Sequence, residues 1–356
     1  MKLYLLTIVV ACCASPLLAT EASSQPTVPA ADMQGVLTAL KELKPKPIET
    51  LSAEEARVQP TPADAVKVYL QEHHQGAMPE KVGHVDDRSI DGPGGKIKIR
   101  VYRPDGEGPF PVVVYYHGGG FVIADLDVYD ATPRALSNAA KSVVVSSHYR
   151  QGPEHKFPAA HEDAFAAYQW TLANAGEIHG DPARIAVAGE SAGGNLAAAV
   201  CLMARDQGVR APIHQLLVYP VTDNDLTTPS YQEHANAKPL NRAMMEWFFK
   251  NAATPEDIQD PRLGLLKNAN VAGLPSATVI TAQIDPLRSE GKAYADKLRA
   301  AGVHVEYKNF EGVTHEFFGM GAAVKEAKAA EMFAAKCLNQ AFNGADAKKS
   351  TVSLRE

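Results

Sequence analysis

The chain has 356 residues, of which 46% are hydrophobic and 21% charged, the usual proportions of a globular protein. This length accommodates one large domain with an accessory element. The formal net charge of −6 offers no basic surface for nucleic acid, so no nucleic-acid partner is expected.

The first 22 residues have the pattern of a secretory signal peptide. A basic start at Lys2 precedes an apolar run over 3–18, and small residues at Ala19 and Ala22 mark the expected cleavage region. The run is marginal for a membrane span, so no stable span is expected once it is removed. The protein is therefore predicted to be secreted or periplasmic. A lipid anchor at Cys12 is a less favoured alternative.

Residues 23–80 are predicted to supply helices to a cap. Apolar residues recur at helical spacing over 32–43, and Pro45 ends that pattern. Ser52, followed three residues later by Glu55, has the spacing of a capping box that opens a second helix. A third helix is predicted over 63–74. A sheet requires none of these helices.

The remaining chain alternates between predicted strands and helices. A hairpin over 82–102 turns at 91–95, and later strands are predicted at 111–116, 141–147, 184–188, 215–219, 277–282 and 303–310, with helices at 133–140, 160–173 and 195–204. Near-continuous apolar strands separated by helices indicate a parallel sheet covered on both faces. The fold class is thus α/β, with a sandwich core over 81–225 and 262–342.

Two segments depart from this alternation. Residues 226–261 break the rhythm, and an aromatic and Met-rich helix over 240–249 is well placed to join the N-terminal helices in a cap. Residues 343–356 are polar and are expected to fray as a tail.

The most informative motif is Gly-Glu-Ser-Ala-Gly over 189–193, with Gly194 behind it. It lies between a predicted strand and a predicted helix. Such a sharp turn thrusts the central hydroxyl, that of Ser191, out of the chain beside the N–H groups of the helix start. This pattern indicates a nucleophilic serine, although a plain strand-to-helix turn has the same sequence features.

A serine hydroxyl needs a base, and the base needs an acid to orient it. His315 lies in the loop 311–317, which follows the last predicted strand. The other histidines fall in strands, helices or connections. Asp285 directly follows the strand over 277–282. The order Ser191, Asp285, His315 is that of a nucleophile, acid and base on this type of sheet.

A Gly-rich run at 117–120 begins with His117 and follows the strand over 111–116. It lacks the Lys-Thr or Lys-Ser that a phosphate loop requires. Consecutive glycines instead let the N–H groups of Gly118 and Gly119, with that of Ala192, approach a developing oxyanion.

Metal and cofactor chemistry find little support in the sequence. His155, His161, Glu162 and Asp163 gather acidic and imidazole groups, but without a recognised zinc-binding spacing, so no metal is expected. Once the signal is removed, Cys201 and Cys337 remain. Both are predicted to be buried in helices, and a single bridge between them is left open.

Together these motifs resemble the hormone-sensitive-lipase-like branch of the α/β-hydrolase family, the bacterial family IV esterases. The similarity runs from about residue 51 to residue 342 and rests on 117–120, 149–150, 153–155, 157–160, 189–194, 285–287, Gly312, His315 and Phe317.

The resemblance implies a carboxylesterase that hydrolyses short to medium acyl esters through a Ser-His-Asp triad and an acyl-enzyme. Its partner would be a small-molecule ester, and neither a metal nor an organic cofactor is implied. The family also implies a cap built from the N-terminal segment and an insertion after the sixth strand, and some relatives form homodimers.

Three departures leave substrate preference open. Glu190 replaces the commoner aspartate before the serine, as in a subgroup with Gly-Glu-Ser-Ala-Gly, and 151–152 and 283–284 also differ from the usual residues. The alternatives are a ligand-binding module of the receptor type, an amidase and a long-chain lipase on the same scaffold.

Overall fold

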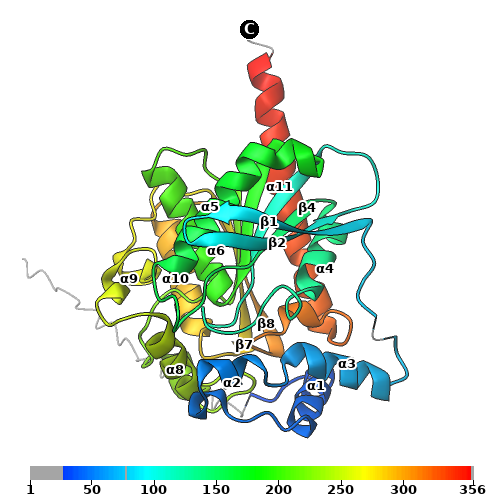
Figure 1. Cartoon of the computed structure of the whole chain (residues 1–356), viewed down its shortest axis with the longest axis vertical. Coiled ribbons are helices and arrows are strands. Elements are labelled where there is room, and N and C mark those ends of the chain that lie inside the picture. Colours follow the sequence, from blue (N-terminus) through cyan, green and yellow to red (C-terminus); the bar gives the residue numbers. More distant parts are fainter. Residues whose placement is uncertain (1–26, 77, 354–356) are drawn as a thin grey trace, which may run out of the picture.

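The structure is a computed structural model, and it describes residues 27–76 and 78–353 (Figure 1). The predicted signal peptide over 1–22, with Cys12, lies outside the described residues. No helix in the described ranges is both long enough and apolar enough to cross a bilayer.

Eight strands form one mixed, mostly parallel sheet in the order β1-β2-β4-β3-β5-β6-β7-β8. β1 pairs antiparallel with β2, and β2 with β4, whereas every later pairing is parallel. The strands are β1 (His84–Gly92), β2 (Gly95–Arg103), β3 (Phe110–Tyr116), β4 (Val143–Ser147), β5 (Gly180–Glu190), β6 (His214–Val218), β7 (Ser276–Ile284) and β8 (Val305–Thr314). The α/β fold with a largely parallel sheet is confirmed.

Helices cover both faces of this sheet. One face packs against α5, α6 and α10, and the other against α1, α4 and α11. Their bounds are α1 (Ala31–Glu42), α4 (Ala131–Ala140), α5 (Ala159–Asn174), α6 (Ala192–Asp206), α10 (Arg288–Ala300) and α11 (Lys325–Ser353).

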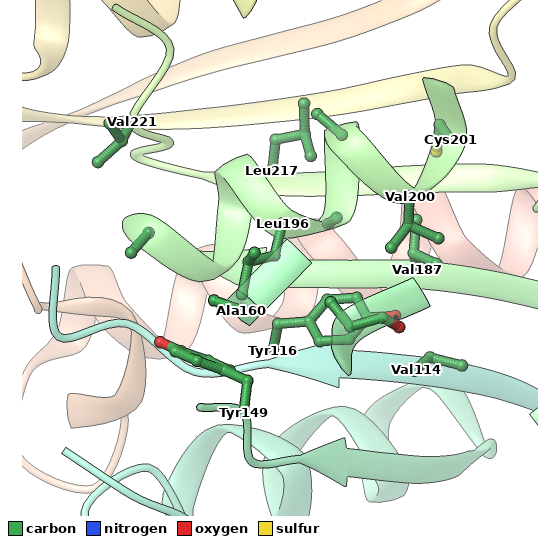
Figure 2. Close-up of a cluster of buried hydrophobic side chains, with 14 of the residues drawn as sticks. Val114, Tyr116, Tyr149, Ala160, Val187, Leu196, Val200, Cys201, Leu217 and Val221 are labelled. Atoms are coloured by element: carbon green, nitrogen blue, oxygen red, sulfur yellow. Dashed lines mark hydrogen bonds between the residues drawn. The ribbon is translucent and has the colours of Figure 1, made fainter. Parts of the chain in front are cut away.

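The two-sided cover explains why the strands read as continuous apolar runs. In β3, Val112 and Val114 pack with the α6 side, while Val113 and Tyr115 pack with the α11 side, because successive side chains point to opposite faces. Figure 2 shows the first cluster, in which side chains of α6 meet those of the strands; the labelled residues include Val114, Val187, Leu196, Val200 and Leu217.

Four helices, α1, α2, α3 and α8, lie together at one end of the sheet (Figure 1). Besides the helices that cover the sheet, the chain forms α2 (Ala53–Arg57), α3 (Pro62–Glu72), α7 (Pro229–Glu233), α8 (Arg242–Ala252) and α9 (Leu265–Asn268), with a 3₁₀ turn, η1, at Ile48–Thr50; of these, α9 packs against α6 and α10. The indole N–H of Trp247 in α8 donates to the carbonyl of Leu51 (3.1 Å), which ties the insertion to the N-terminal segment. The predicted capping box of Ser52 and Glu55 is present at α2.

Several element ends differ from the prediction, among them the start of β4 and the C-terminal end of the chain's last helix. Lys141, expected to begin a strand, takes the left-handed conformation that ends α4 (φ 48°), so β4 begins at Val143. The polar tail predicted from 343 continues α11 as far as Ser353 instead. Alanine and lysine recur there, and both favour helix even where no apolar face needs burial.

Cys201 and Cys337, the two cysteines in the described part of the chain, are buried and unbridged. Cys201 lies in α6 and Cys337 in α11, on opposite faces of the sheet, so the bridge left open by the sequence does not form. Both behave as small apolar core residues.

Candidate active site

Ser191 stands alone between the end of β5 and the start of α6. Its backbone has φ 57° and ψ −119°. Residues other than glycine rarely adopt this conformation, but a sharp strand-to-helix turn requires it. The turn is held on both sides, because the N–H of Ser191 donates to the carbonyl of Val218 (2.9 Å) and its carbonyl accepts from Val221 (3.1 Å).

The turn also requires close backbone packing. A Cβ on Gly193 would lie 2.0 Å from the carbonyl oxygen of Tyr116, at the end of β3. Glycine at this position therefore allows α6 to begin directly over the central strands, which fixes the position of the Ser191 hydroxyl.

His315 and Asp285 meet Ser191 in the order that the sequence predicts. Nε2 of His315 lies 3.0 Å from Oγ of Ser191, and Nδ1 lies 2.8 Å from Oδ2 of Asp285. A carboxylate only accepts hydrogen bonds, so Nδ1 carries the proton and Nε2 accepts from the serine hydroxyl. All three are buried, with relative exposures of 5% for Ser191, 0% for Asp285 and 2% for His315.

The connection that carries His315 differs from the predicted loop over 311–317. β8 continues to Thr314, and a register shift after Ala282 lets Ile284 pair with Thr314. His315 thus follows the strand at once rather than after a five-residue loop. Asp285 also directly follows its strand, β7, so adjacent strand ends hold the acid and base side by side.

The imidazole of His315 packs against a buried aromatic ring and a half-buried carboxyl. The Tyr219 ring lies 4.4 Å away between ring centres, and Oε1 of Glu316 lies 4.0 Å from Nε2. Burial disfavours the imidazolium, but the Asp285 carboxylate, supported by Glu316 and Glu190, outweighs it and raises the pKa of His315 above 6.5.

Glu190 is a site residue that the sequence analysis noted only as a departure from the family pattern. Its carboxyl accepts a hydrogen bond from Tyr115 (2.5 Å) and another from Tyr219, the same ring that packs on His315. Burial raises the pKa of Glu190 to about 7 despite the surrounding hydroxyl donors. Glu190 therefore anchors the ring that positions the imidazole.

Glu316 is a second site residue that the sequence did not reveal. Its backbone has φ 68°, and both carboxyl oxygens accept from the Tyr129 hydroxyl (2.7 and 2.6 Å). Burial raises its pKa, with His315 acting in the opposite direction. The only sequence signal was its position next to His315, since Tyr129 lies far away in the chain.

The Gly-rich run forms a tight turn beside Ser191. Gly119 has φ 95°, and a Cβ there would lie 2.2 Å from the carbonyl oxygen of Ile123. The Tyr149 hydroxyl holds the turn through the carbonyls of His117 (2.9 Å) and Gly118 (3.0 Å). Gly119 and Ser191 line the same cavity.

The three predicted oxyanion donors are not engaged elsewhere. Among the hydrogen bonds within 27–76 and 78–353, none uses the N–H of Gly118, Gly119 or Ala192. Ala192 begins α6, so its N–H is one of those that the helix itself leaves unsatisfied.

The cavity over Ser191 has a volume of about 620 Å³ and is lined by both predicted cap segments. Its apolar wall includes Leu37, Leu40, Ile123, Leu240, Met244 and Phe248. Its size and apolar lining are those of a small-molecule site.

Two of the four candidate metal ligands, His161 and Asp163, make other contacts. His161 bonds to Oδ1 of Asn195 through Nε2 (2.8 Å), and the Asp163 carboxylate accepts from Arg150. No group of three or more His, Cys, Asp or Glu in the described part of the chain is arranged to hold a metal ion.

Comparison with known proteins agrees with this geometry. Residues 113–319 match the family model of the alpha/beta hydrolase fold. The chain is 43% identical to the carboxylic ester hydrolase LipN of Mycobacterium tuberculosis (68% of this chain, 67% of LipN). It is 39% identical to the carboxylesterase NlhH of the same organism (85% of this chain, 94% of NlhH).

Solved structures extend the likeness to the fold. A hyperthermophilic esterase from the archaeon Pyrobaculum calidifontis matches with a TM-score of 0.80 at 35% identity, covering 88% of this chain and 98% of that one. Sequence and structure thus lead to one conclusion: the chain belongs to the α/β-hydrolase family, in its hormone-sensitive-lipase-like branch.

Proposed function

We propose that the protein is a carboxylesterase that hydrolyses short to medium acyl esters through an acyl-enzyme on Ser191. The observation that carries this proposal is the hydrogen-bonded series from the Ser191 hydroxyl through His315 to Asp285, facing an apolar cavity of about 620 Å³. The esterase names of the relatives support the same chemistry.

In the first half-reaction, Oγ of Ser191 attacks the ester carbonyl while Nε2 of His315 takes the hydroxyl proton. Asp285 keeps the proton on Nδ1 and stabilises the imidazolium. The imidazolium then gives its proton to the leaving alcohol, and the acyl group stays on Oγ. Water then attacks the carbonyl of the acyl-enzyme while His315 takes its proton. The bond to Oγ breaks, which releases the acid and restores the Ser191 hydroxyl.

Negative charge on the carbonyl oxygen is stabilised by the backbone. The N–H groups of Gly118, Gly119 and Ala192 are the donors, and each such donor lowers the barrier by about 3 kcal/mol in comparable sites. Because they belong to a rigid turn and a helix start, they need no reorganisation during the reaction.

The raised pKa of His315 predicts the pH dependence. Only the neutral imidazole can accept the serine proton, so kcat/KM for p-nitrophenyl butyrate falls as the pH drops through a midpoint above 6.5. Removing the nearby negative charge in Glu316→Gln disfavours the imidazolium and moves this midpoint to lower pH. An unmoved or raised midpoint in the variant, measured on protein of native circular dichroism, contradicts this electrostatic account.

The substrate class is tested with p-nitrophenyl esters from acetate to palmitate and with p-nitrobutyranilide as the amide counterpart. We expect kcat/KM to peak between butyrate and octanoate, to fall about tenfold or more by palmitate, and to be far smaller for the anilide. A maximum at palmitate supports the lipase alternative, and comparable turnover of the anilide supports the amidase. Stoichiometric binding of the esters without turnover supports the receptor-like module.

Two further expectations rest on the sequence pattern of the first residues and on the family resemblance, respectively. Export through residues 1–22 and assembly as a homodimer stay predictions. The N-terminal sequence of the secreted protein and its mass in solution are the corresponding measurements.

A further inference from the structure

The rim of the Ser191 cavity is basic, although the whole chain has a formal net charge of −6. Four exposed lysines line it, and they are called the lysine rim below: Lys41, Lys44, Lys46 and Lys238. Within 27–76 and 78–353, none of them forms a salt bridge at 4.0 Å or less. The lysine rim is therefore available to a charge that arrives from solution.

Both parts of the cap contribute to the lysine rim. Lys41 lies in the last turn of α1, and Lys238 belongs to the insertion between α7 and α8. Lys44 and Lys46 alternate with Pro45 and Pro47, and prolines restrict the backbone of this connection. The N–H of Lys46 also donates to the side chain of Gln59 (3.0 Å). The charges are thus carried by a constrained backbone.

Few carboxylates oppose these lysines. Glu49 lines the same cavity, with one oxygen buried and without a partner. Glu55 does not line the cavity, and its carboxylate is engaged by Ser52. Hydrogen bonds from Ser52, and more weakly the charge of Lys46, lower the pKa of Glu55. Even with Glu49 counted, positive charge predominates at the rim.

Charge is distributed unevenly along the cavity. Beside Ser191 lies the half-buried carboxyl of Glu316, and the wall includes the apolar side chains of Leu240, Met244 and Phe248. A ligand that lies with one end at Ser191 meets a carboxyl and apolar groups first and cations at the rim. An anion is therefore disfavoured near the serine and favoured at the rim.

We propose that the preferred substrates are esters whose acyl chain ends in an anionic group, such as a carboxylate, far enough from the ester carbonyl to reach the lysine rim. The proposal rests on the proposed esterase function, because Ser191 must hold the carbonyl. It makes a specific statement about length: a short chain places its anion in the apolar part, and a longer chain places it at the lysines.

The test compares mono-p-nitrophenyl esters of succinate, adipate and suberate with the same molecules methylated at the far carboxyl. We expect the ratio of kcat/KM, anionic over neutral, to lie below one for succinate and to reach about fivefold for suberate at low salt. The suberate ratio should fall toward one in 0.5 M NaCl, because exposed charges are screened.

Variants then assign the effect to the lysine rim. Replacing its four lysines by glutamine should bring the suberate ratio to one or below. Lys98→Gln is the matched control, since Lys98 is an exposed lysine of β2 that does not line the cavity. It should keep the wild-type ratio.

Two results overturn the proposal: a suberate ratio of one or less in the wild type, or a high ratio that survives the fourfold substitution. Binding of the wild type, but not of the variant, to phosphatidylglycerol vesicles together with a suberate ratio of one assigns the lysines to a lipid surface and also overturns it. The methylated, neutral esters distinguish failure of this proposal from failure of the proposed esterase function. A protein that hydrolyses none of the neutral esters refutes the esterase function itself.

Discussion

Ser191→Ala should lower kcat/KM for p-nitrophenyl butyrate at least about a thousandfold, with the folded structure retained. The substitution removes only Oγ, the atom 3.0 Å from Nε2 of His315, and so removes the nucleophile. Alanine has no greater difficulty than serine with the backbone at φ 57°. The residual rate should reflect binding and the backbone donors alone. Steady-state kinetics and a thermal melt of the same sample provide the measurement.

Ser146→Ala is the matched control for this variant. Ser146 is a buried serine of β4 whose hydroxyl has no hydrogen-bond partner, so its loss should leave both kcat/KM and Tm nearly unchanged. If a folded Ser191→Ala protein retained near-normal turnover, the assignment of the nucleophile would be wrong.

Asp285→Asn should also have a large effect, a loss of about ten-thousandfold in kcat. The carboxylate accepts the Nδ1 proton of His315 at 2.8 Å, and that bond leaves Nε2 free to act as the base. An amide N–H facing Nδ1 favours the other tautomer, in which Nε2 carries the proton and cannot accept one from Ser191. The side chain keeps its shape, so KM should change far less than kcat.

Asp163→Asn separates this effect from the general cost of altering a buried aspartate. Asp163 is 1% exposed and accepts from Arg150, away from the triad, so its loss should lower Tm while kcat stays within about tenfold of wild type. A similar loss of kcat in both variants would show that Asp285 has only a structural role.

The triad could be placed from the sequence because each member follows a strand of the parallel part of the sheet. Strands of a parallel sheet end at the same edge, so Ser191 after β5, Asp285 after β7 and His315 after β8 must come close together. Glycines around the serine supplied the turn. Local pattern and sheet topology therefore suffice for these residues.

The surroundings of the imidazole could not be predicted in this way. Glu190 meets Tyr115 and Tyr219 across the sheet, and Glu316 meets Tyr129 from a loop 187 residues earlier. These contacts depend on how deeply each side chain is buried and on the strand register, including the shift between β7 and β8. Neither periodicity nor motif spacing encodes those quantities.

Helix ends show the same limit. The sequence placed the start of the fourth strand at Lys141 and predicted a frayed tail over 343–356, whereas Lys141 closes α4 and α11 reaches Ser353. Each end is decided by competition between local propensity and packing. The apolar patterns that predicted the elements fade at those points.

Active-site labelling tests the central claim most directly, namely that His315 and Asp285 activate Ser191 as a nucleophile. The full-length protein is treated with a fluorophosphonate, weighed intact and digested for peptide mapping. We predict a single adduct per chain on Ser191, absent in Ser191→Ala and formed far more slowly in Asp285→Asn. An adduct at another residue, or none on protein that hydrolyses esters, would contradict the account.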